Sequence, residues 1–339
     1  MPTRSSRRGT ARATGIAVVV VALCAAAGVG AGVARPERAG ALPILGDLLG
    51  GVTKTLTDVV GTVDPLVKQQ LPADPKIWGP YTSRPTPEKC TDGNRYCIDT
   101  TIADMTARFD SLAPTCHHSA LFSLLYLRVT ERYKVYAETP GTFLDVATVN
   151  REDAIFYDLY AATFAEWRAG QPARVPPIWR LAYATADARQ ATGTGDLLLG
   201  MAAHILRDLP FTLYAIGTVS YQDHLTINPM LKSVYSAVVA EAAARFDPTV
   251  SLADVVPGES TLVVDVIAQW RDKAWRDAQA LAAATSAQGR QAVADRIERE
   301  AWTTGLAIYT GLRYPAQNAT VVRDSYCADH WQAQHWQAG

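Results

Sequence analysis

The chain has 339 residues, which is enough for one large domain or two ordinary ones. Its 48% hydrophobic and 19% charged residues are typical of a globular protein and exclude an intrinsically disordered one. The formal net charge is -1 at pH 7, so the chain as a whole is not strongly basic. Ala and Leu are abundant in the second half of the chain, and this favours an all-α fold.

Residues 1–41 have the features of a secretory signal peptide. A basic segment is followed by an apolar run over residues 16–27, and Ala39-Gly40-Ala41 fits a small-x-small cleavage site. Residues 32–34 offer a second cleavage position, and an uncleaved membrane anchor is the alternative. Cleavage after Ala41 removes six of the 32 basic residues and one of the 33 acidic residues, which leaves a net charge of -6.

We therefore predict a protein that is secreted or associated with the cell envelope. After cleavage it would have no stable membrane span, and its negative charge argues against a nucleic-acid partner. A small molecule or a component of the cell envelope is the expected partner.

Four cysteines follow the predicted cleavage site, and an even number in an exported chain predicts two disulfides with three conceivable pairings. We favour Cys90–Cys97, which would close a turn at Asp92-Gly93, together with Cys116–Cys327, which would tie the C-terminal tail to the start of the domain. A zinc site made of these cysteines is less consistent with the sequence, because it contains no Cys-x2-Cys pair.

The folded part is predicted to be a single helical bundle of about eight helices over residues 89–312. Residues 42–88 form a Gly- and Pro-rich linker, and residues 313–339 form a tail without a predicted helix. Asn150 and Asn228-Pro229 provide start signals for two of the helices. Apolar spacing and caps predict helices at residues 99–112, 117–138, 151–169, 177–191, 196–214, 230–245, 260–284 and 288–312.

The helix predicted over residues 196–214 carries the strongest candidate site. His204 and Asp208 lie one turn apart on an apolar stripe that also contains Leu197, Met201, Ile205 and Thr212. Burial of an imidazole and a carboxylate is costly unless they are paired or bound to a ligand. Pro210 cannot donate to the carbonyl of Leu206, which adds an irregularity beside the pair.

This spacing has two interpretations. His204 and Asp208 suit two ligands of one divalent metal ion such as zinc, with Asp153 or His224 as a further ligand. A metal-bound water would then attack an ester or phosphoester. Alternatively, the pair is an internal polar clamp in a non-enzymatic binding or structural domain. Asp153 would then be a first-turn acid, and His224 would be a polar residue in a loop beside Asp223.

The common motifs of hydrolases, kinases and dehydrogenases are missing, since the sequence contains no Gly-x-Ser-x-Gly, Walker loop, dinucleotide fingerprint or His-Glu-x-x-His. A buried arginine at Arg271 could clamp an anionic substrate. We prefer the interpretation that its stem packs on the indole of Trp275 while its charge pairs with a carboxylate.

The segment Gly200-Met201-Ala202-Ala203-His204-Ile205, followed by Asp208-Leu209-Pro210, resembles the signature of the domain-of-unknown-function family 5995. Leu125-Tyr126, Trp179-Arg180 and Ala274-Trp275 support the resemblance, which extends over residues 109–281. That family is a largely bacterial group of helical proteins with no assigned activity. The resemblance implies a helical fold and a distinctive central helix, and it implies no reaction.

Overall fold

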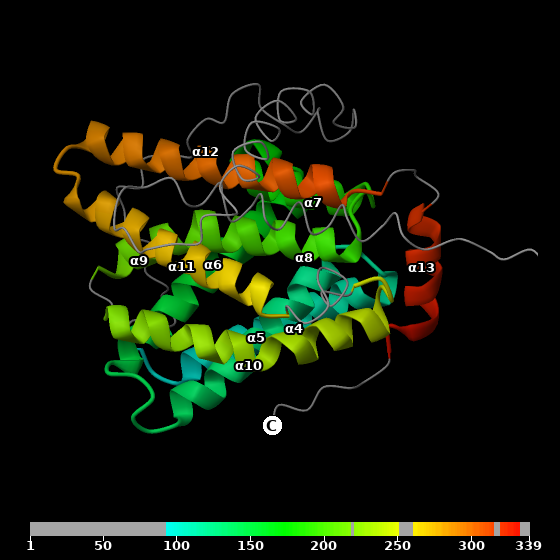
Figure 1. Ribbon diagram of the computed structural model, residues 1–339, viewed down its shortest axis with the longest axis horizontal. Helices are drawn as coiled ribbons and strands as arrows, with labels where there is room; N and C mark the ends of the chain where they lie inside the picture. The colour runs from blue at the N-terminus through cyan, green and yellow to red at the C-terminus, as the bar shows by residue number, and fades with distance from the viewer. Residues whose placement is uncertain (1–92, 218–219, 251–259, 315–318, 333–339) are drawn as a thin grey trace, which may run out of the picture.

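The computed structural model describes residues 93–217, 220–250, 260–314 and 319–332 (Figure 1). Within these ranges the protein is all-α, as predicted, with one isolated β-bridge between Ala191 and Arg313. None of the described helices is both long and apolar enough to cross a membrane. The predicted signal peptide, the predicted linker and the predicted Cys90–Cys97 disulfide lie wholly or partly outside the described residues.

The helices follow one another through short connections. They are α4 (Tyr96–Leu112), α5 (Ala120–Glu138), α6 (Val146–Arg168), α7 (Pro177–Asp187), α8 (Gly193–Ala202), α9 (Leu209–Ile216), α10 (Tyr221–Arg245), α11 (Ser260–Ala283), α12 (Ala287–Leu312) and α13 (Ala319–His330). A π-helical segment, Ala203–Asp208, joins α8 to α9. Together, α8, the π-helical segment and α9 form one continuous helical rod, which we call the central rod. In Figure 1 the central rod runs through the middle of the bundle, between α12 on one side and α10 on the other.

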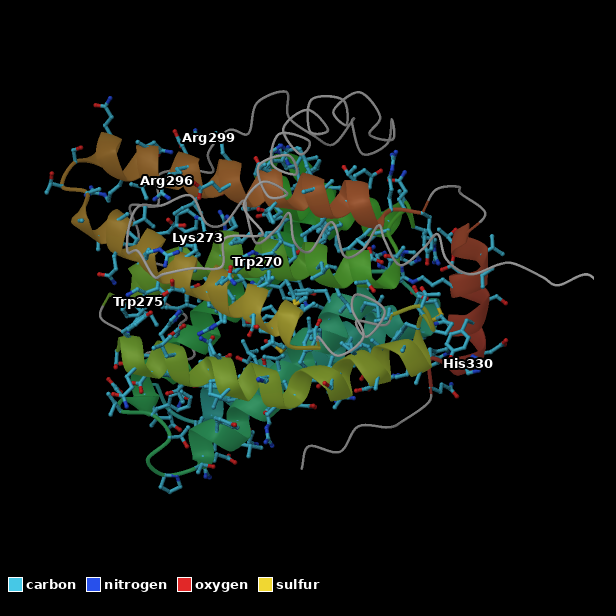
Figure 2. All side chains as sticks on the ribbon, in the orientation of Figure 1. Trp270, Lys273, Trp275, Arg296, Arg299 and His330 are labelled. Carbon is cyan, nitrogen blue, oxygen red and sulfur yellow. A yellow bond between two sulfur atoms is a disulfide. The ribbon has the colours of Figure 1, made fainter. Side chains whose placement is uncertain are left out.

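The core is built from large apolar side chains that these helices direct inward. Trp179, Trp270, Tyr160 and Tyr309 are among the largest side chains that are completely buried. A polar cluster fastens α11 to α12 at the periphery, where Asp277 accepts hydrogen bonds from Lys273 of its own helix and from Arg296 of α12 (Figure 2).

Helix α6 starts earlier than predicted. Its N-cap is Asp145, whose carboxylate accepts a hydrogen bond from the backbone N–H of Thr148. Asn150, the predicted cap, lies inside the helix, where it is buried and hydrogen-bonded to Tyr133 at 2.7 Å. The two residue types cap helices equally well, so local sequence did not distinguish them. The earlier start places Asp153 in the second turn, beyond the first-turn role considered for it.

Helix α10 also starts earlier than predicted, because it continues through Pro229 instead of beginning there. Ser220 is its N-cap, and the side chain of Asn228 accepts a hydrogen bond from Arg271 instead of capping a helix. Asp223 and His224 consequently lie in the first turn of α10 and are buried, whereas the sequence had placed them in a loop.

The C-terminal tail contains a helix that the sequence analysis did not predict. This helix, α13, packs at one end of the bundle against α10 (Figure 1). The predicted disulfide Cys116–Cys327 is confirmed and links α13 to the segment before α5. Arg323 adds a buried ion pair to Asp196 of α8 at 2.6 Å. The tail is therefore part of the bundle.

Candidate functional site

The central rod changes its helical geometry at the candidate site. The N–H of Leu209 bonds to the carbonyl of His204, five residues earlier, as in a π-helix. Pro210 has no N–H to donate, and a wider turn immediately before it accommodates the missing bond. π-Helical turns inside α-helices are frequent at functional sites. The sequence predicted a local irregularity at Pro210 but not this change of helix type.

His204 and Asp208 are both buried, with 3% and 0% of their surfaces exposed. The Nδ1 atom of His204 lies 3.0 Å from Oδ2 of Asp208. Trp179 donates its indole N–H to the same oxygen at 2.8 Å, and Arg207 donates to Oδ1 at 2.8 Å. Arg207 also donates to Glu298 at 2.9 Å, so the carboxylate belongs to a buried, charge-assisted network.

This network fixes the hydrogen-bonding role of the imidazole. A carboxylate only accepts hydrogen bonds, so Nδ1 of His204 carries the proton and donates to Asp208. Burial lowers the pKa of His204, although Asp208 opposes this effect, and the ring is therefore neutral. The other nitrogen, Nε2, is then a bare acceptor, and it has no hydrogen-bond partner among the described residues.

Aromatic rings hold the imidazole in place. The ring of His204 stacks on Phe156 of α6, with centroids 3.4 Å apart and planes 9° apart. Tyr126 of α5 meets it edge-on at 4.5 Å. The ring therefore has little freedom to rotate, and Nε2 keeps a fixed direction.

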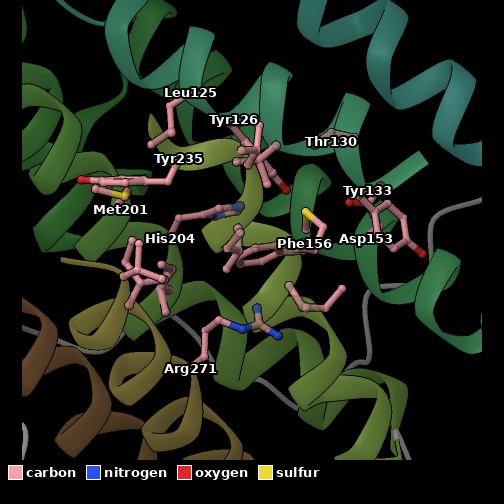
Figure 3. A pocket seen from close by; sticks show the side chains of 18 of the residues that line it. Leu125, Tyr126, Thr130, Tyr133, Asp153, Phe156, Met201, His204, Tyr235 and Arg271 are labelled. Carbon is pink, nitrogen blue, oxygen red and sulfur yellow. The ribbon is translucent and has the colours of Figure 1, made fainter. Parts of the chain in front are cut away.

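A cavity of about 110 Å³ lies beside His204, between α5, α6, the π-helical segment, α10 and α11 (Figure 3). Most of its lining is apolar and includes Leu125, Val129, Met201, Met230 and Ile267. Five of its lining residues each contribute a buried polar atom with no hydrogen-bond partner among the described residues: Tyr126 Oη, Thr130 Oγ1, Asp153 Oδ2, His204 Nε2 and Tyr235 Oη. Such atoms are rare in folded proteins, and five of the twelve found among the described residues belong to residues that line this cavity.

Three ionisable side chains also line the cavity: Glu152, Asp153 and Arg271. Burial raises the pKa of Asp153 to about 7, with a further contribution from neighbouring Glu152. Burial likewise raises the pKa of Glu152 to about 7, against the lowering effect of Arg271. The pKa of Arg271 falls to about 10, chiefly through burial, so this guanidinium stays charged at neutral pH.

The four predicted metal ligands do not form a metal site. In the described ranges, no three His, Cys, Asp or Glu side chains gather closely enough to hold a metal ion. Both oxygens of Asp208 already accept hydrogen bonds, and Nε2 of His224 lies 3.1 Å from the carbonyl of Arg271. The donors therefore do not fit a zinc ion, and no metal-assisted hydrolysis follows from this geometry.

Sequence reasoning missed the cavity residues on α5 and α10. Tyr126 and Thr130 are four residues apart on the apolar face of α5, and Tyr235 lies on the buried face of α10. The family resemblance included Leu125-Tyr126 but implied no role for it. A threonine within an apolar stripe is a weak signal, because threonines in helices usually bond to their own backbone.

Comparison with known proteins supports the family assignment. The model described as "Family of unknown function (DUF5995)" matches residues 98–311, which is more than half of the chain. No curated protein and no solved structure matches the sequence. The matched range contains all the cavity residues described above.

Asp208→Asn should destabilise the protein by about 2–4 kcal/mol, because it removes one of the two carboxylates that compensate buried Arg207. Urea unfolding measures this change in the free energy of unfolding. Asp187→Asn is a matched control, since Asp187 also accepts from a tryptophan and contacts a histidine but its side chain is 41% exposed. The control should cost less than about 1 kcal/mol. Equal costs at the two positions would contradict the buried network.

Asp153→Asn should make stability less dependent on pH. The folded protein keeps the Asp153 proton up to about pH 7, whereas the unfolded chain releases it near its ordinary pKa of 3.8. The free energy of unfolding of the native protein therefore falls as the pH rises from about 4 to 7. The amide cannot ionise, so the variant's advantage should grow by about 1–3 kcal/mol between pH 5 and pH 8.

Unfolding curves at the two pH values measure this difference. The exposed Asp158 on the same helix provides the control variant Asp158→Asn, which should follow the native pH dependence. Parallel pH profiles for native protein and Asp153→Asn would show that the Asp153 carboxyl is not held protonated.

Proposed function

This chain belongs to DUF5995, a family of unknown function, and we propose that it binds a small, mostly apolar molecule in the cavity beside His204. The observation that carries this proposal is that five residues lining one mostly apolar cavity each have a buried polar atom with no hydrogen-bond partner among the described residues. Small-molecule sites typically combine an apolar wall with a few fixed polar groups.

The free-energy cost of the partnerless polar atoms favours a ligand-binding role for the cavity over a purely structural one. A buried polar atom without a partner costs about 1–3 kcal/mol, and evolution seldom leaves several of these costs together. A ligand with a hydroxyl or amide group would recover part of this free energy on binding. The cavity of about 110 Å³ is of the same order as the dry cavity of about 150 Å³ that holds benzene, so it suits a compact molecule.

His204 would recognise the polar group of the ligand. Asp208 holds the imidazole as a neutral ring with Nε2 unprotonated, and Phe156 fixes its plane. Nε2 is therefore an acceptor for a ligand hydroxyl or N–H group. The function of the His204–Asp208 clamp is then positioning for binding, which agrees with the non-enzymatic alternative raised by the sequence.

We also propose that binding takes place outside the cytoplasm. The basic and apolar pattern of residues 1–41 supports export. The Cys116–Cys327 disulfide supports it independently, because such bonds persist mainly in oxidising compartments.

Phenol and toluene test the proposal, because they have nearly the same shape and only phenol has a hydroxyl. Ligand-detected NMR should show saturable binding of both compounds, with phenol tighter because its hydroxyl can donate to His204. Val264→Phe places a ring into the cavity and should weaken both. Val321→Phe makes the same change at a 63% exposed position on α13 and should leave binding unchanged. Absence of binding by both compounds, or binding that survives Val264→Phe, would contradict the proposal.

A further inference from the structure

Arg271 differs from the other buried arginines in its surroundings. The described residues include four buried arginines, and three of these form an ion pair with a carboxylate within 3 Å: Arg207, Arg245 and Arg323. Arg271 is only 5% exposed, yet no carboxylate of the described residues lies within 4 Å of it. A buried charge without a counter-charge is costly, and proteins usually retain one for a purpose.

The hydrogen bonds of Arg271 leave part of its guanidinium free. Nε donates to the side chain of Asn228 at 3.0 Å, and Nη2 donates to the carbonyl of His224 at 3.0 Å and lies 3.4 Å from Nδ1 of the same histidine. Both partners are neutral groups on α10, so they orient the guanidinium without neutralising it. Nη1 makes no hydrogen bond to a described residue, and Figure 3 shows the guanidinium extending toward Phe156 within the cavity.

The acids near Arg271 do not supply a dependable counter-charge. Glu152 and Asp153 line the same cavity, and burial raises the pKa of each to about 7. At or below that pH, a large fraction of each is a neutral carboxylic acid. Burial also lowers the pKa of His204, which disfavours its charged form. At mildly acidic pH, the guanidinium of Arg271 is therefore the one side chain among these cavity residues that stays fully charged.

We infer that the ligand of this cavity is an anion, a compact apolar carboxylate, and that Arg271 binds its carboxylate group. This inference rests on the proposed function, because it specifies the class of molecule that enters the same cavity. The free Nη1 donors and the fixed plane of the guanidinium suit a carboxylate oxygen. The apolar body of the ligand would lie between α5 and α10, where Val129, Met230 and Leu231 form the wall.

Three compounds with one phenyl ring and different charges test this inference: benzoate, benzamide and benzylamine. Titration of the native protein at pH 6 by ligand-detected NMR should give benzoate at least about tenfold tighter binding than benzamide, the typical gain from one charge-assisted contact. Benzylamine should bind more weakly than benzamide. This comparison uses only the native protein, so it does not depend on the folding of a variant.

Variants then assign the preference to Arg271. Arg271→Gln should remove the advantage of benzoate over benzamide, and Arg271→Lys should keep part of it because the positive charge remains. Arg276→Gln, at an exposed arginine on the same helix, should leave the advantage unchanged.

The outcomes separate this inference from the proposed function. Equal binding of benzoate and benzamide, or a preference for benzylamine, would overturn the anionic ligand while leaving apolar binding intact. Absence of binding by all three compounds would overturn both. An advantage of benzoate that survives Arg271→Gln would place the anion elsewhere.

Discussion

The buried carboxylate of Asp208 determines the geometry at the centre of this bundle. It accepts hydrogen bonds from Trp179, Arg207 and His204, which come from α7 and the π-helical segment. A charge in this position is tolerated only because donors surround it, and each donor is oriented in return. The consequence that matters for function is the state of His204: one nitrogen is committed to Asp208, and the other remains an acceptor beside a cavity.

The π-helical turn contributes to the cavity because it positions His204 at the cavity wall. Pro210 cannot extend a regular helix, so the preceding turn widens, and His204 and Asp208 stay close enough to bond at 3.0 Å. Phe156 and Tyr126 then pack on the imidazole, and the surrounding helices leave a mostly apolar space beside it. The site is thus rigid on the imidazole side and mostly apolar elsewhere, which suits selective binding of a small molecule.

The sequence predicted the all-α fold, the burial of His204 with Asp208 and the Cys116–Cys327 disulfide, because apolar periodicity and cysteine number are strong local signals. It did not predict where α6 and α10 begin. Asn150 and Asn228 look like caps, but tertiary contacts use their amides to bond Tyr133 and Arg271. The cavity could not be predicted either, since it depends on how five segments pack together. Contrary to the preferred expectation, Arg271 forms no ion pair with a carboxylate in the part of the chain that the structure describes, and spacing along one helix could not have revealed this.

The charge and tautomer of His204 test the account most directly. Nitrogen-15 NMR of the imidazole, with the signals assigned from a His204→Gln variant, reports which nitrogen carries the proton. The account predicts a proton on Nδ1, a bare Nε2 and a titration midpoint below the ordinary histidine value, because burial lowers the pKa of this ring. It also predicts that phenol shifts the Nε2 signal most strongly. Titration near the ordinary histidine pKa of about 6.5, or a proton on Nε2, would contradict it.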